Sequence, residues 1–200
     1  ATDSALQIEL FNTMDVFFKQ SDVWQEDIDM VIPPSQPAGT IYYLIPTSPS
    51  LIVNLLWAFQ LPDDPNTLRG PQIIGVAMSV PGEMVLAVQP SEQVTYRVTV
   101  SLTVEDPVGR DGYVQFPAWV LAKYRETIRH GVLGHMFSQP QKPWTNNQLG
   151  VFHMRKFVAG YSQARLDMRR NNIYKQQPWR FPSFAGGNQR GRSSRWAPPQ

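Results

Sequence analysis

The chain of 200 residues contains no cysteine, so no disulfide framework of the kind that small secreted domains often need can form. It also lacks an apolar run of about 18 residues, the minimum for a membrane-spanning helix; the longest candidate, residues 51–59, is too short and includes Asn54. Its first residues do not show the basic and then apolar layout of a secretory signal. These absences predict a protein of cytosolic origin without a membrane span.

Catalytic and metal-binding motifs are missing as well. The three histidines, His130, His135 and His153, form no H-E-x-x-H pattern, and the spacing of His130 and His135 puts them on different sides of a helix. The acidic stretches 63–66 and 105–107 lack the long, regularly spaced loop of a calcium site. Residues 131–134 (GVLG) have no Walker lysine, and their small side chains instead predict close approach of another helix. We therefore expect no enzyme activity, no metal and no cofactor.

Acidic residues are scarce at one end of the chain. From Arg155 onward there are ten Lys or Arg residues and one acid, Asp167, a net charge of +9, whereas residues 1–154 carry −7. Such polarity favours a partner with the opposite arrangement, which can be nucleic acid or another copy of the same protein in a ring.

Helical periodicity is present in three segments. Residues 4–20 begin with a capping-box pattern and predict a first helix. Pro117 favours the start of a second helix, and Thr145 with Gln148 forms a capping box at the start of a third, after a turn at residues 141–146. Apolar residues recur at helical spacing in the last two: Ala118, Leu121, Tyr124, Ile128, Val132 and Met136, then Leu149, Phe152, Phe157, Tyr161, Ala164 and Met168. The pattern predicts a helical hairpin on which the first helix packs.

Short apolar runs between turn residues predict about five antiparallel strands, at residues 40–46, 51–60, 72–80, 84–89 and 94–104. Residues 94–104 alternate valine, tyrosine and leucine with threonine, arginine and serine, which predicts one buried and one solvated face. Before these strands, acidic residues surround Trp24. This cluster has two interpretations, a solvated loop with an anchoring tryptophan or a docking site for basic residues; its acids are Asp22, Glu26, Asp27 and Asp29.

The predicted architecture is α+β, in four parts. Residues 1–21 form the N-terminal helix of a helical body, 22–113 an inserted antiparallel β domain, 114–171 the helical hairpin of the same body, and 172–200 an extended basic tail.

The tail has almost no aliphatic residues and no acid, so it cannot order itself by burying a core. Aromatic and basic side chains are interleaved along it, as at interface hot spots, and we expect them to bind a partner: Tyr174, Lys175, Trp179, Arg180, Phe181, Phe184, Arg190, Arg192, Arg195 and Trp196. Prolines space the aromatics of residues 174–184, as in an arm that fits successive protein pockets. Residues 186–192 with Trp196 are also similar to an RGG-type segment, which contacts phosphates and stacks on bases.

The order of these elements, together with local patterns, resembles the head-to-tail adaptor (connector) proteins of tailed, particularly short-tailed, bacteriophages. The resemblance covers roughly residues 4–170. The segments that carry it are 17–26 (FFKQSDVWQE), 42–46 (YYLIP), 117–120 (PAWV), 124–128 (YRETI), 131–133 (GVL), 142–146 (KPWTN) and 157–160 (FVAG).

This resemblance implies a structural virion protein of the neck, assembled in the host cytoplasm. It implies a homo-oligomeric ring, usually of twelve copies, that lies beneath the portal protein, extends the channel for viral DNA toward a tail or nozzle protein, and inserts its C-terminal arm into the portal. In such a head-to-tail ring, we expect oppositely charged and aromatic residues at the subunit contacts: Trp24, Glu26, Asp27, Trp144, Arg165, Arg169 and Arg170. A nucleic-acid-binding protein that uses the basic aromatic tail is the alternative function.

Overall fold

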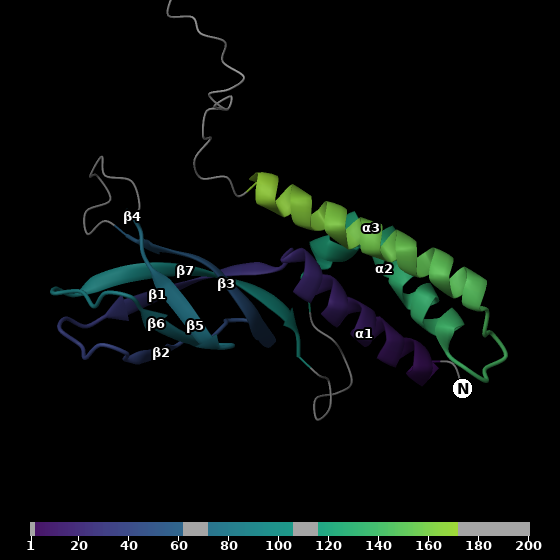
Figure 1. The fold of residues 1–200 in the computed structure, drawn as a ribbon, viewed down its shortest axis with the longest axis horizontal. Helices are drawn as coiled ribbons and strands as arrows, with labels where there is room; N and C mark the ends of the chain where they lie inside the picture. The colour runs from purple at the N-terminus through teal and green to yellow at the C-terminus, as the bar shows by residue number, and fades with distance from the viewer. Residues whose placement is uncertain (1–2, 62–71, 106–115, 172–200) are drawn as a thin grey trace, which may run out of the picture.

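The computed structural model describes residues 3–61, 72–105 and 116–171, and it has the predicted α+β architecture. Three helices gather at one end and two antiparallel sheets at the other (Figure 1). The helices are α1 (Asp3–Ser21), α2 (Ala118–Ser138) and α3 (Asn147–Asn171). The described residues contain seven strands where the sequence predicted about five: β1 (Gln25–Ile32), β2 (Ile41–Tyr43), β3 (Ser50–Gln60), β4 (Gln72–Ile73), β5 (Val76–Val80), β6 (Glu83–Leu86) and β7 (Val94–Val104).

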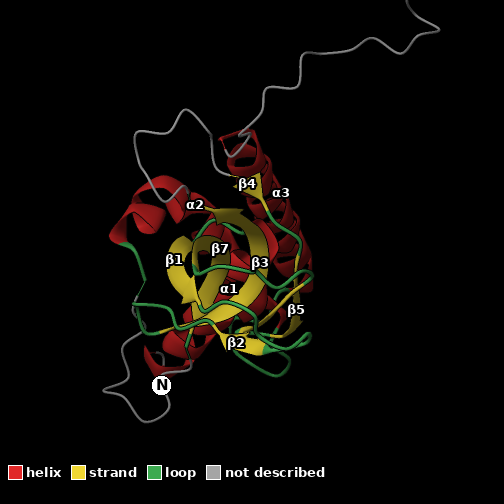
Figure 2. Cartoon of the chain, turned by 90° about the vertical axis from the view of Figure 1, so that its left-hand side faces the viewer, coloured by secondary structure: helices red, strands yellow, loops and turns green. Residues whose placement is uncertain are grey.

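The two sheets have the strand orders β1-β7-β3-β4 and β2-β6-β5. Viewed from the sheet end, β1, β7 and β3 twist around one another in front of the helices (Figure 2). Strand β1 was not predicted; interpreting its acidic residues as a solvated loop was wrong. Ile28, Met30 and Ile32 alternate with more exposed residues along β1. The sequence therefore has the period of two that is typical of a strand, although the segment is rich in acidic residues. The predicted strand 72–80 is in fact two strands that belong to different sheets.

Strand β7 has the predicted bounds but not the predicted solvated face along its whole length. Burial alternates at its start, whereas Thr99, Ser101 and Thr103 are all buried toward its end. There α1 covers the strand, and Thr103 Oγ1 donates to Asp15 Oδ1 at 2.9 Å. Hydroxyl groups that find partners inside the protein can be buried without a large desolvation penalty.

The predicted packing of α1 on the helical hairpin is confirmed, and the three helices approach closely at Gly131. A Cβ atom at this position would lie 2.9 Å from Phe157 Cδ2 and would also meet Thr13 Cγ2. The interpretation of residues 131–134 as a place of close helix approach is therefore correct. The buried stripe of α2 is rotated from the predicted one, because Ala118 and Leu121 are exposed and the buried positions are Val120, Tyr124, Ile128, Gly131 and Gly134.

The turn between α2 and α3 ends differently from the prediction. Asn146, not Thr145, caps α3, since its Oδ1 accepts a hydrogen bond from the Leu149 amide at 3.1 Å. Thr145 Oγ1 instead ties the turn together by donating to the Gln139 carbonyl and accepting from the Lys142 amide. The prediction of a capping box formed by Thr145 and Gln148 was therefore wrong, whereas the prediction of a helical hairpin was correct.

Several expectations concern residues outside the described ranges. The tail at 172–200, the acidic stretch at 63–66, and residues 106 and 107 fall there. Among the helices that the structure describes, none combines the length and hydropathy required to cross a membrane.

Candidate interaction site at the end of helix α3

Asp22 joins the helices to the sheet. It terminates α1 in a left-handed conformation (φ 52°), and its amide donates to the Phe18 carbonyl at 3.1 Å. Its carboxylate accepts a hydrogen bond from Asn54 Nδ2 of β3 at 3.0 Å, and the other oxygen lies 3.7 Å from Arg165 Nε of α3. One side chain therefore fixes α3 relative to the end of α1 and the middle of β3.

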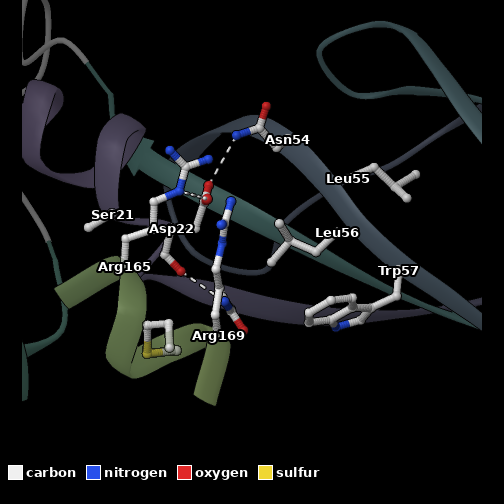
Figure 3. Close-up of a pocket in the computed structure, with 10 residues that line it drawn as sticks. Ser21, Asp22, Asn54, Leu55, Leu56, Trp57, Arg165 and Arg169 are labelled. Carbon is white, nitrogen blue, oxygen red and sulfur yellow. Dashed lines mark hydrogen bonds and ion pairs between the residues drawn. The ribbon is translucent and has the colours of Figure 1, made fainter. Parts of the chain in front are cut away.

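A cleft of about 370 Å³ opens beside Asp22, between α3 and β3. Arg165 and Arg169, one helical turn apart, both extend into it toward Asp22 and Asn54 (Figure 3). Trp57 lies on the β3 side, and Met168 completes an apolar portion of the lining. The cleft thus combines two guanidinium groups, one carboxylate and apolar surface, beside the last two turns of α3.

The predicted subunit contacts of the acidic segment take partners within their own chain. Trp24 is only 6% exposed and packs on Phe18 with ring centroids 5.2 Å apart, so little of its indole is left for a neighbour. Asp27 accepts a hydrogen bond from Thr99 Oγ1 at 2.6 Å. Glu26 accepts from the Thr47 amide at 2.6 Å.

Two carboxylates of this segment have altered pKa values. Burial raises the pKa of Glu26, but hydrogen bonds from Thr47 and Ser48 outweigh it and leave the pKa below its usual value. Asp29 receives two hydrogen bonds of 2.7 Å from the Arg97 guanidinium, which lower the pKa of that carboxyl. Both groups are therefore held ionised by hydrogen bonds within their own chain; the docking-site interpretation stays a prediction.

The predicted basic contacts lie elsewhere. Arg165 and Arg169 line the cleft and Arg170 is exposed beside them, whereas Trp144 lies in the turn at the opposite end of α3. The structure thus brings together the three arginines but not the full set of predicted contacts. The predicted partner-binding residues of the tail all lie outside the described ranges: Tyr174, Lys175, Trp179, Arg180, Phe181, Phe184, Arg190, Arg192, Arg195 and Trp196.

The outward face of α3 was missed by the sequence analysis. It exposes large apolar side chains together with the basic residues Arg155 and Arg170; the apolar ones are Leu149 (43% exposed), Val151, Phe152 (51%), Val158 and Leu166. Leu149 and Phe152 were assigned to the buried stripe, which is wrong because α2 and α1 cover the opposite side of α3, at Phe157 and Ala164. The sequence contained a signal for this second stripe: apolar residues are spaced by seven and then eight positions, at Val151, Val158 and Leu166.

No group of three or more histidine and acidic side chains in the described parts of the chain is arranged to hold a metal ion. His130 and His135 point to different sides of α2, as predicted. His130 meets His153 of α3 instead, with the two Nδ1 atoms 2.8 Å apart, a pairing that residue spacing along one helix could not indicate.

Replacing Asp22 tests its role as the link between α1, β3 and α3. Asp22→Asn retains a residue that tolerates positive φ but removes the charge opposite Arg165, so we expect a loss of about 0.5–1 kcal/mol of unfolding free energy. Asp22→Ala also loses the hydrogen bond to Asn54 and strains the backbone, with an expected loss of about 2 kcal/mol. Urea unfolding measures both; Glu126→Gln, at a 70% exposed side chain, is the control and should change stability by less than about 0.5 kcal/mol. Equal stability of Asp22→Ala and the parent protein would contradict the linking role.

Comparison with known proteins does not assign a function to this site. No protein-family model matches the sequence, and no curated protein matches it.

Proposed function

We propose that the protein is a head-to-tail adaptor of a tailed bacteriophage: a structural virion protein that forms a ring beneath the portal and bridges it to the tail. Its partners are further copies of itself, in a dodecameric ring, the portal protein, a tail or nozzle protein, and the viral DNA that passes through the channel. The C-terminal arm, residues 172–200, docks on the portal. The proposal begins from the resemblance in the sequence, and two features of the fold support it.

The first feature is where the segments that carry the resemblance lie. Phe17 and Phe18 of α1 are fully buried. The ring of Phe17 packs on Tyr124 of α2, 5.3 Å between centroids, and the ring of Phe18 packs on Trp24. Gly131 and Phe157, from two further segments, meet across the hairpin. Residues scattered through the sequence therefore build one common core, as expected when a shared pattern specifies a fold.

The observation that carries the proposal is the outward face of α3. Five large apolar side chains are exposed on it, and exposed apolar surface of this kind is typical of protein interfaces. Interspersed arginines suit an interface with the acidic body of a neighbour. Because α3 leads directly to the basic arm, the same helix can contact a neighbour and direct the arm toward a partner.

Substitutions on this face test the assembly. Val158→Asp with Leu166→Asp places two carboxylates among the exposed apolar residues of α3, and we expect it to shift the protein from a ring to monomers because the interface would have to bury unpaired charge. Analytical ultracentrifugation measures the shift. Val88→Asp, at an 80% exposed position two residues after β6, is the matched control and should leave the ring intact. Loss of the ring in both variants, or in neither, contradicts the assignment of this face.

Removal of residues 172–200 tests the arm. The truncated protein should still form the ring but fail to attach to isolated portals in a sedimentation assay, and unchanged attachment would contradict the docking role.

Nucleic-acid binding is the second candidate function, and the exposed Arg169 and Arg170 at the end of α3 favour it. It predicts that the full chain binds oligonucleotides tightly and that the affinity falls steeply with salt. The slope of log K against the logarithm of the salt concentration should be about −0.9 for each duplex phosphate contact. Weak and salt-insensitive binding contradicts it.

A further inference from the structure

The interface between α2 and α3 contains a pair of histidines that the proposed function does not use. His130 of α2 and His153 of α3 face each other with Nδ1 atoms 2.8 Å apart, and their ring centroids are 5.0 Å apart. Phe137 stacks on His153 at 5.7 Å, and Phe152 meets both imidazoles edge-on. The two rings are therefore held in contact by aromatic neighbours from both helices.

The hydrogen bond between these rings limits how many protons the pair can hold. One Nδ1 must carry a hydrogen and donate, and the other must be unprotonated and accept. A first added proton can enter the Nε2 atom of the donor ring and leaves the bond intact. A second must enter the accepting Nδ1, which removes the bond and places two positive rings in contact.

In the described parts of the chain, the acids on the elements around the pair contact other side chains. On α2, Arg129 and Glu126 pair with each other at 3.5 Å. On α3, Lys156 lies 6.0 Å from the centre of the Phe152 ring. On α1, Glu9 is engaged elsewhere, by Gln139 and near His135. Burial, His130 and Arg129 all lower the pKa of His153.

We propose that His130 and His153 form a proton-sensitive latch, which holds α2 and α3 together when at most one of the two rings is charged and loosens the hairpin when both are. Because the folded protein resists the second proton while both histidines of the unfolded chain accept protons near their usual pKa of about 6.5, stability is fully present above that pH. It is lost as the pH falls below about 6.5 toward the lowered pKa of His153. The latch does not depend on the adaptor function.

Urea unfolding between pH 7 and pH 5 tests the latch in the full chain. We expect the folding equilibrium constant of the parent protein to fall about tenfold more over this range than that of His130→Phe/His153→Phe, which keeps aromatic rings but takes no proton. If the double variant folds poorly, the single variant His153→Phe replaces it in this comparison. His135→Phe, on the same helix as His130 but outside the pair, is the control. Its folding equilibrium constant should fall with pH as much as that of the parent protein. An equal decrease in the parent and the double variant overturns the latch, as does an NMR titration in which both histidines take up protons independently at their usual pKa.

Discussion

Phe18→Ala should lower the free energy of unfolding by about 3–5 kcal/mol, a large loss for a single truncation. Phe18 is fully buried, and its ring packs within 6.4 Å of the rings of Phe17, Trp24 and Phe116. Truncation leaves a cavity where α1 meets the first strand and the start of α2, and rigid aromatic neighbours cannot collapse to fill it. Urea unfolding followed by circular dichroism measures the loss.

The matched control for this truncation is Phe152→Ala, at the same residue type but with 51% of the side chain exposed. It removes little buried surface and should lower stability by no more than about 1.5 kcal/mol. Comparable losses in the two variants would contradict the view that Phe18 is central to the core and Phe152 is not.

Gly131→Val should destabilise the protein by about 2–3 kcal/mol although valine is a better helix former than glycine. The new side chain would collide with the Phe157 ring and with Thr13 Cγ2, so α1 or α3 has to move away from α2. Thermal or urea unfolding measures the effect. Ala159→Val, at an exposed position of α3, introduces the same side chain without the collision and should cost about 0.5 kcal/mol. A neutral Gly131→Val would show that the three helices do not approach as closely as described.

The sequence predicted the elements of this fold better than the faces they bury. The three helices, the hairpin and β7 follow from periods of 3.6 and 2, which are local properties of the chain. The orientation of α2 depends instead on Gly131, whose missing side chain admits Thr13 and Phe157 to the helix surface. The small residues at 131–134 predicted close approach of another helix, but the apolar pattern that set the predicted stripe does not count a glycine as a buried position. Likewise, the burial of Thr99, Ser101 and Thr103 depends on α1 crossing β7, a long-range contact.

The candidate site was predicted only in part, for a similar reason. Charge asymmetry drew attention to Arg165, Arg169 and Arg170, which lie together at the end of α3; their role as subunit contacts stays a prediction. The pairing of Arg165 with Asp22 joins residues 143 positions apart, and nothing in their local sequence links them. Trp24 looked available because tryptophan is common at interfaces, but in this fold it packs on Phe18.

Electron microscopy of the full chain, alone and mixed with isolated portals, tests the central claim most directly. The adaptor proposal predicts a closed ring of identical subunits, with twelve-fold symmetry, and density for residues 172–200 against the portal in the mixture. A chain that stays monomeric in both samples, or a ring that never contacts the portal, would contradict it.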